Sequence, residues 1–311
     1  MRTSIHSPYA DCDSPIAAAK RPHSCITEKE KSFASPTQRI RTLISAEFDD
    51  IEENDDPTSL FSPSLSQPDI FIACQETLEA EQCVEEEDAS DDDSETFDPY
   101  LFMFTLPPHS TVAIQGKLCL SPPTNYHQKS LVLDLDETLV HCTVEPIPNP
   151  DFIFPVTFNS VCYQVYARKR PFVDYFLESV SKEFEVIIFT ASQQVYADKL
   201  LDLLDPENKY FSSRLFREAC LDVSGNFIKD LSVLNRDLSK TVLVDNSPYA
   251  YGYQIDNGIP IESWFDDDED TELLKLVGFL RQLHSAPDVR KLLRDRFKTF
   301  KLVEMAGSVH F

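Results

Sequence analysis

The residues best suited to chemistry lie in three short polar groups, each directly after a run of apolar residues. The sequence reads Asp-Leu-Asp-Glu-Thr from Asp134, Thr-Ala-Ser from Thr190 and Asp-Asn-Ser-Pro from Asp245. A single acidic residue after a strand is usually a helix cap or a turn residue, but three such groups together indicate a site. Oxygens of Asp134 and Asn246 are the hard ligands that Mg²⁺ takes along with water and substrate oxygens.

These groups suit phosphoryl transfer. A metal ion would neutralise an incoming phosphate, so that a carboxylate could attack it and form an aspartyl-phosphate. A second carboxyl two residues later, Asp136, could protonate the leaving oxygen and then activate water, a contribution of about 10²–10⁴-fold in rate. Thr190 and the amides of the helix after it would form an anion site. One more cation should hold the phosphate, and the candidates are Lys229, Arg217, Arg236 and Lys240.

Lys229 is the preferred cation because a hairpin is predicted directly before it. Residues 215–230 are expected to form a strand, a turn at Ser224-Gly225 and a second strand, and glycine at a two-residue turn is typical of hairpins. A hairpin inserted before the third strand can lean over the strand ends, which would bring Lys229 to the phosphate.

The elements that must position these residues form one α/β domain. Three nearly continuous apolar runs are typical of strands covered on both faces: 131–135, 185–189 and 241–244. Helix-like segments lie between and after them: 173–184, 195–204 and 272–283. This alternation predicts a parallel sheet with helices on both sides, and ligands bind beyond the carboxyl ends of such strands. The three polar groups should therefore meet at one site.

Four motifs, in this order and at these separations, resemble those of the haloacid-dehalogenase-type phosphatases: DLDETLVHC, FTAS, GNFIKDLS and VDNSP. More narrowly, residues 128–298 are similar to the small carboxy-terminal-domain phosphatases, and most to the CTD small phosphatase-like protein 2 group. The resemblance implies a HAD-like, Rossmann-type three-layer domain with a β-hairpin insertion. It also implies that Asp134 is the phosphorylated nucleophile, that Asp136 is the acid and base, and that Thr190 and Lys229 stabilise the transition state.

The resemblance further implies a magnesium site and a class of substrate. Mg²⁺ would be held by Asp134, by Asp136 through its main-chain carbonyl and by Asn246, while Asp245 would orient metal-bound water. The implied substrate is phosphoserine or phosphothreonine in a protein, such as the Ser/Pro-rich tail of RNA polymerase II.

Outside this domain the composition changes. Residues 1–96 are rich in Ser, Pro, Asp and Glu. Residues 47–98 hold twenty acidic residues and no basic one, so they supply most of the chain's net charge of −25. Such a chain cannot bury enough apolar surface to offset its conformational entropy, so we expect a disordered acidic arm. Residues 97–127 are a transition segment that is apolar enough to dock in part, and residues 299–311 are expected to be a C-terminal tail.

The arm contains several Ser-Pro pairs, which are candidate sites of proline-directed phosphorylation. An equally weighted alternative is that such pairs are simply common in disordered tails. The pairs in the arm and the transition segment begin at Ser7, Ser14, Ser35, Ser62 and Ser121.

Charge, cysteine content and hydropathy limit the partners and the cellular location that we expect for the chain. The acidic arm suits a basic partner or a solvating tail, and it argues against direct binding of nucleic acid, which needs clustered Lys and Arg. No stretch approaches the roughly 18–20 apolar residues of a membrane span. Eight cysteines without a CxxC pair indicate free thiols of a reducing compartment, so we expect a nuclear or cytosolic protein, with the nucleus preferred.

Several alternatives are weighed against the aspartate mechanism. Cys162 and Arg168 have the C-x₅-R spacing of cysteine-dependent phosphatases, but the residues between them alternate like a strand. A calcium loop starting at Asp134 would have Leu139 where glycine is needed, and no P-loop motif occurs. A non-catalytic phosphopeptide-binding adaptor and a phosphatase of other small phosphate esters stay open, although an adaptor has no need of both Asp134 and Asp136.

Overall fold

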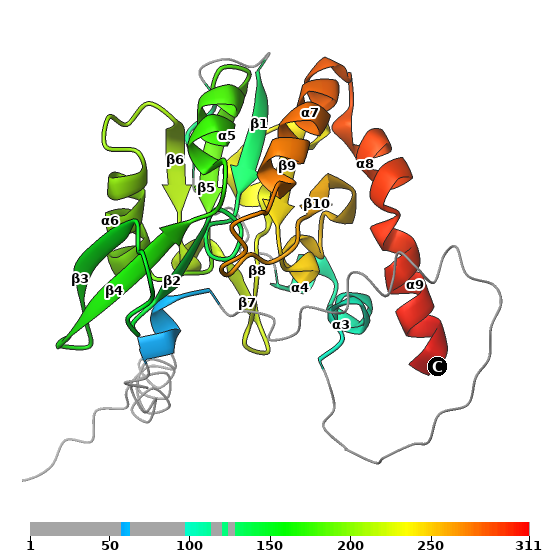
Figure 1. The fold of residues 1–311 in the computed structure, drawn as a ribbon. Coiled ribbons are helices and arrows are strands. Elements are labelled where there is room, and N and C mark those ends of the chain that lie inside the picture. Colours follow the sequence, from blue (N-terminus) through cyan, green and yellow to red (C-terminus); the bar gives the residue numbers. More distant parts are fainter. Residues whose placement is uncertain (1–56, 63–96, 113–119, 124–127, 311) are drawn as a thin grey trace, which may run out of the picture. The chain divides into compact units, whose positions relative to one another are not determined.

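The computed structural model describes residues 57–62, 97–112, 120–123 and 128–310. A five-stranded parallel sheet lies at its centre, with the strand order β10-β9-β1-β5-β6 (Figure 1). The strands are β1 (Lys129–Leu133), β5 (Phe184–Phe189), β6 (Phe211–Leu215), β9 (Thr241–Asp245) and β10 (Gly258–Pro260). The three apolar runs of the sequence form β9, β1 and β5, which are neighbours in this sheet, so the prediction of a parallel sheet is confirmed.

Both faces of the sheet are covered, because successive residues of a strand point to opposite sides. Leu131 and Leu133 belong to one hydrophobic cluster, whereas Val132 between them belongs to another. The first cluster takes buried residues from α5 (Val173–Val180), α6 (Gln194–Leu204), α7 (Glu272–Ser285) and α8 (Val289–Phe297). The second takes them from α3 (Pro99–Thr105), α9 (Thr299–His310) and short 3₁₀ turns. The predicted three-layer α/β domain is confirmed.

The second face of the sheet is not covered by the helices that the sequence predicts. All three helices predicted from the sequence contribute to the first cluster, and the second face is covered by short 3₁₀ turns together with α3 and α9. Residues 299–310, expected to be a tail, form α9, which packs on α3. The two helices approach closely at Gly307, where a Cβ atom would lie 2.4 Å from the Phe104 ring. Part of the transition segment therefore belongs to the folded domain.

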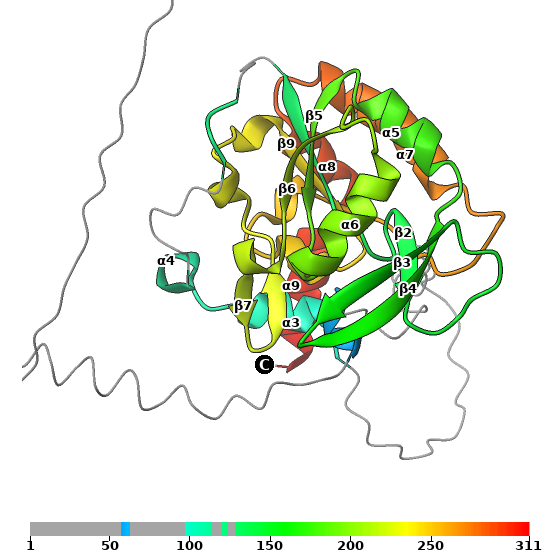
Figure 2. The same cartoon turned by 90° about the vertical axis from the view of Figure 1, so that its left-hand side faces the viewer.

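Two antiparallel units extend from the central sheet. The larger has the order β2-β4-β3 and lies beside α6 (Figure 2). The smaller is the predicted hairpin, and its turn residues Ser224 and Gly225 have φ of 56° and 83°, as a two-residue turn of this type requires. The strands are β2 (Val140–Thr143), β3 (Phe152–Phe158), β4 (Val161–Lys169), β7 (Leu221–Val223) and β8 (Asn226–Ile228).

The remaining elements are short. They are the helix α4 (His109–Val112) and the 3₁₀ turns η1 (Pro57–Leu60), η2 (Arg217–Ala219), η3 (Leu231–Leu234), η4 (Leu238–Lys240), η5 (Pro248–Tyr251) and η6 (Ile255–Asn257). The turn η1 departs from the expectation of a disordered arm, because Leu60 is fully buried against the domain. The rest of the arm lies outside the described residues. No helix in the described part of the chain is long and apolar enough to span a membrane.

Candidate active site

The sheet itself brings the three polar groups together. Its register pairs Leu133 with both Ile188 and Val244, so the chain leaves β1, β5 and β9 at the same level. The first residue beyond β1, Asp134, still donates its main-chain N–H to the Val244 carbonyl at 3.0 Å. The site residues predicted from the sequence therefore meet at one edge of the sheet, the edge at which the β7–β8 hairpin also lies (Figure 1).

Both carboxylate oxygens of Asp134 are fixed by donors. Lys229 Nζ lies 2.5 Å from Asp134 Oδ1, and Thr138 Oγ1 donates to Asp134 Oδ2 at 3.1 Å. The same Thr138 hydroxyl lies 3.4 Å from Asn246 Oδ1. Only 2% of Asp134 is exposed. The Asp134 side chain is therefore held in one orientation directly after β1.

Lys229 lies between two carboxylates, as the hairpin argument predicts. Its Nζ is 2.5 Å from Asp134 Oδ1 and 2.5 Å from Asp245 Oδ2, and its main-chain N–H donates to the Ala250 carbonyl at 2.7 Å. Burial would lower the pKa of Lys229, but the two carboxylates outweigh burial and raise it. Lys229 is therefore a permanent buried cation next to Asp134.

Asp136 has a different electrostatic setting from Asp134. Its carboxylate accepts from Ser192 Oγ at 2.5 Å and from Tyr196 OH at 2.5 Å, and both partners are neutral hydroxyls. Burial raises the pKa of Asp136, the two hydroxyls lower it and the nearby Asp134 raises it, with a net rise. Asp136 is 1% exposed. A carboxyl in this position is suited to carry and donate a proton.

Thr190 and Ser192 present hydroxyls to the same space. The Ser192 main-chain N–H donates to Thr190 Oγ1 at 3.0 Å. Ser62, from the N-terminal segment, places its Oγ 3.2 Å from Thr190 Oγ1 and 3.3 Å from Ser192 Oγ. Thr190, the residue of the predicted anion site, thus lies beside the hydroxyls of Ser192 and of Ser62, a serine from a distant part of the chain.

Asp245 is the last residue of β9, and Asn246 follows it directly. Asp245 pairs with Lys229 and also accepts the Ser247 N–H at 2.9 Å. Burial raises the pKa of Asp245 to about 7, with Lys229 acting in the opposite direction. Asn246 Nδ2 donates to Ser263 Oγ at 2.9 Å, which turns its carbonyl oxygen toward Thr138.

A buried arginine supports the loop that carries the two aspartates. Arg170 is 1% exposed and donates Nη1 to the Thr138 carbonyl at 3.2 Å and to the Glu262 carbonyl at 2.9 Å. Its other guanidinium nitrogens form a bidentate pair with Asp270 at 2.9 and 2.8 Å. Glu137, in the middle of the loop, adopts φ of 55°. Arg170 thus ties the loop to the segment that follows β10.

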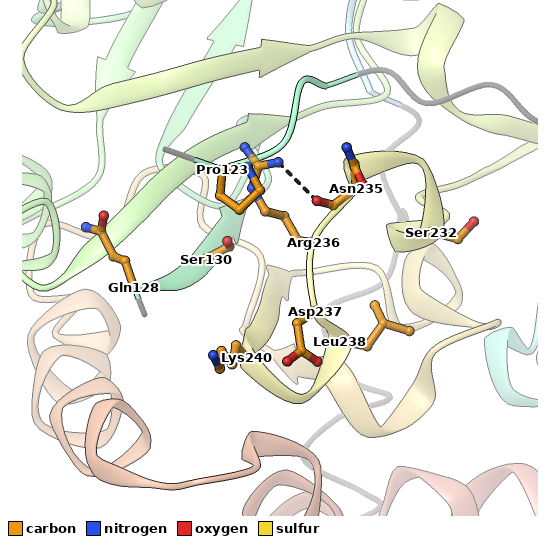
Figure 3. A pocket seen from close by; sticks show the side chains of 9 residues that line it. All are labelled: Pro123, Gln128, Ser130, Ser232, Asn235, Arg236, Asp237, Leu238 and Lys240. Atoms are coloured by element: carbon orange, nitrogen blue, oxygen red, sulfur yellow. Dashed lines mark hydrogen bonds between the residues drawn. The ribbon is translucent and has the colours of Figure 1, made fainter. Parts of the chain in front are cut away.

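The other candidate cations lie elsewhere. Arg236 forms a bidentate pair with Glu185, near the start of β5 and so at the opposite end of the sheet. Arg236 and Lys240 line a cavity of about 460 Å³ there, which holds none of the predicted site residues (Figure 3). Arg217 is closer to the site, but it donates to the Ala191 and Phe61 carbonyls. Of the four candidate cations, Lys229 is the one whose ammonium lies beside Asp134.

The rival cysteine site is not assembled. Cys162 is exposed near the start of β4, and Arg168 lies near the end of the same strand, where it pairs with Asp268. An extended strand cannot curl its amides around a phosphate, as a phosphate-binding nest must.

Sequence reasoning missed four residues of this site: Ser192, Tyr196, Arg170 and Ser62. Ser192 stands in the FTAS motif but received no role, and Ser62 was noticed only as part of a Ser-Pro pair. Tyr196 looks like an ordinary core position of α6. Local pattern carries no signal for a hydroxyl that reaches Asp136 from a sequence distance of 60 residues.

Comparison with known proteins places the chain in a family. Residues 129–290 match the family model of the NLI interacting factor-like phosphatases. The CTD small phosphatase-like protein 2 of Dictyostelium discoideum is 54% identical over 216 residues, which cover 68% of this chain and 37% of the relative. The mouse carboxy-terminal domain RNA polymerase II polypeptide A small phosphatase 2 is 47% identical over 182 residues, covering 58% of this chain and 63% of the relative.

Among solved structures, that of Fcp1, an essential RNA polymerase II CTD phosphatase, matches with a TM-score of 0.41 and 20% identity over 60% of this chain and 63% of the other. The chain spans less than two thirds of the length of each of these proteins. The family match covers more than half of the chain and includes both aspartates, Lys229 and Asn246. The chain therefore belongs to the family of NLI interacting factor-like phosphatases.

Proposed function

We propose that the chain is a Mg²⁺-dependent phosphatase of phosphoserine and phosphothreonine in proteins, and that it acts through an aspartyl-phosphate on Asp134. The observation that carries the proposal is a pair of buried carboxyls in opposite electrostatic settings. Asp134 is paired with the Lys229 ammonium, whereas Asp136 has a raised pKa among hydroxyls. A carboxylate nucleophile paired with a cation, beside a second carboxyl that can carry a proton, is what a two-step displacement at phosphorus needs.

The two carboxyls divide the chemistry between them. In the first step, a carboxylate oxygen of Asp134 attacks phosphorus while Asp136 gives its proton to the departing serine or threonine oxygen. In the second step, the ionised Asp136 takes a proton from water as the water oxygen attacks phosphorus, and Asp134 is released with inorganic phosphate. Lys229 and the Thr190 hydroxyl hold phosphoryl oxygens in both steps, so charge is stabilised without reorganisation.

The residues present fit a magnesium ion. Asp134 Oδ2 and Asn246 Oδ1 lie 3.1 and 3.4 Å from the Thr138 hydroxyl, so two hard oxygen ligands of the kind that Mg²⁺ takes face the same hydroxyl. Among the described residues, no three His, Cys, Asp or Glu side chains form a metal cluster. The Asp136 main-chain carbonyl, which the resemblance to the family assigns to the metal, and water would complete the six oxygen ligands that Mg²⁺ prefers. Bound there, Mg²⁺ would offset the repulsion between Asp134 and the phosphate.

The proposed substrates are phosphorylated Ser/Pro-rich protein segments, such as the C-terminal domain of RNA polymerase II. The name of the mouse relative assigns that substrate to the relative, and nearly half of its residues in the matched region are identical to this chain. A segment of this type already contacts the site in the form of Ser62, which proline follows in the sequence.

The test is turnover of a phosphoserine peptide and of p-nitrophenyl phosphate by the purified chain with Mg²⁺. Asp134→Asn should abolish turnover of both, and chelation of Mg²⁺ should abolish it in the wild type. Asp174→Asn is the matched control, because the side chain of Asp174 is 66% exposed on α5 and lies outside the site. A wild-type chain that binds the phosphopeptide but never releases phosphate would be an adaptor and would refute the proposal.

A further inference from the structure

A short N-terminal segment, residues 57–62, lies on the candidate active site. It forms the turn η1 followed by Phe61 and Ser62, and it contacts residues more than 120 positions away. Both views place it at the end of the β2–β4 sheet, near the carboxyl ends of the central strands (Figures 1 and 2). Of the arm expected to be disordered, this segment is the part that the structure describes.

The main chain of this segment is held at three successive residues. The Leu60 carbonyl accepts the Gln193 N–H at 3.0 Å, and the Phe61 carbonyl accepts Arg217 Nη2 at 2.6 Å. The Ser62 main-chain N–H donates to the Asp136 carboxylate. Contacts to main-chain groups hold a peptide whatever its side chains are, so these three positions form a site for a peptide backbone rather than a packing contact particular to Leu60 or Phe61.

The side chains of the segment also contact the apolar part of the domain. Leu60 is fully buried and belongs to the cluster that includes Phe154 and Val156 of β3. The Phe61 ring meets the Tyr196 ring edge-to-face at 4.8 Å between centroids. Two residues after Leu60, the hydroxyl of Ser62 lies against Thr190 and Ser192. The segment thus combines an apolar anchor with a serine at the anion site.

We infer that residues 57–62 occupy the peptide-substrate site of their own chain, with Ser62 in the place of the phosphoserine. The inference rests on the proposed function, which makes Thr190 a phosphate-binding residue and Asp136 the acid. A substrate cannot reach these groups while Ser62 contacts both. The near-complete burial of Asp134, Asp136 and Lys229 agrees with an occupied site. The segment therefore competes with phosphoprotein substrates and must leave before one binds.

Tethering makes such competition effective. A segment in the same chain meets its site at an effective concentration that can reach the order of millimolar, so a weak contact suffices to occupy it. A competitor of this kind raises the apparent KM for substrate and leaves kcat at saturation unchanged.

The test uses the full chain and one probe, a peptide of residues 57–66 with phosphoserine at position 62. Leu60→Asp removes the apolar anchor and should weaken docking of the segment by about 10–100-fold. The KM for the probe should fall by at least about fivefold, with kcat within about twofold of the wild type. Ser62→Ala should shift KM in the same direction and less. Leu274→Asp, at an exposed leucine of α7, is the matched control and should change neither constant.

A second measurement is independent of turnover. Hydrogen exchange should show a protected amide at Ser62, the N–H that the segment donates to Asp136, in the wild type. That protection should be lost in Leu60→Asp and when the probe saturates the inactive Asp134→Asn variant. An unchanged KM in Leu60→Asp, a fall in its kcat, or an unprotected Ser62 amide in the wild type would each overturn the inference. If the wild type hydrolyses no phosphopeptide, the proposed function fails, and hydrogen exchange alone then decides whether the segment is docked.

Discussion

Lys229 is the residue whose replacement tests the electrostatics of the site most severely. It is 2% exposed and is the cation shared by Asp134 and Asp245. Lys229→Met keeps the length of the side chain and removes the charge. Two buried carboxylates then face each other without compensation, and breaking a buried pair in this way costs about 3–5 kcal/mol. For a domain of this size the expected fall in Tm is about 6–20 °C.

Turnover should fall by a separate mechanism. Loss of one preorganised charge that stabilises the transition state costs about 10²–10³-fold in kcat. A lysine that pointed into an open crevice would contribute little to stability, but Lys229 is buried between two carboxylates, so its loss should also destabilise the fold. Stability and turnover can be separated by a second substitution. Adding Asp245→Asn removes one of the two unpaired charges, so the double variant should recover Tm but not kcat.

The assay is kcat on p-nitrophenyl phosphate at a temperature below the Tm of every variant, with Tm from circular dichroism. Lys182→Met is the control, because the side chain of Lys182 is 68% exposed and pairs only with Glu178. A Lys229→Met variant that keeps kcat within about threefold of the wild type would refute the assigned role. A double variant that recovers kcat together with Tm would show that the loss comes from misfolding.

Three further predictions concern residues around the site. Cys162→Ser should keep kcat near the wild-type value, because Cys162 is exposed on β4, and a dead but folded variant would support cysteine chemistry. Arg170→Met should lower the free energy of unfolding in urea by about 3–5 kcal/mol, since it leaves Asp270 and two carbonyls unpaired, and a change under about 1 kcal/mol would contradict this. Glu185→Gln should lower Tm at pH 7 and leave kcat unchanged. Burial acts to raise the pKa of Glu185, but hydrogen bonds from Arg236 and Ser130 lower it overall, so its stabilisation is present above the ordinary value of 4.5 and is lost as the pH falls below it. The Tm difference should therefore shrink in acid, and a difference that grows there would refute the pairing.

The parts of the fold that sequence predicts are those that local pattern specifies. Continuous apolar runs mark β1, β5 and β9, because a strand covered on both faces needs apolar residues at every position. Polar residues at the ends of these strands conflict with burial, and this conflict locates the site. Gly225 marks the hairpin turn, because its φ of 83° is one that glycine adopts without strain. The position of Lys229 follows from that turn.

Other parts depend on contacts that local pattern does not record. The helix α9 contains Gly307, which weakens helix propensity, and only the approach of Phe104 explains why glycine stands there. Arg170 lies in a basic run that looks like solvated surface, yet it is fully buried, because carbonyls and Asp270 from distant segments surround it. Leu60 and Phe61 form too short an apolar pair to be distinguished from the acidic arm around them. The location in the nucleus or cytosol and the basic partners of the arm stay predictions.

The central claim is that Asp134 carries the phosphoryl group, and trapping the phosphoenzyme tests it most directly. Asp136→Asn lacks the base that activates water, so an aryl phosphate with a good leaving group should charge Asp134 faster than the acyl phosphate is hydrolysed. Acid quenching followed by mass spectrometry should then find one hydroxylamine-sensitive phosphoryl group on the peptide that contains Asp134, and none in Asp134→Asn. A phosphoryl group on Cys162, or turnover by Asp134→Asn at the wild-type rate, would contradict the account.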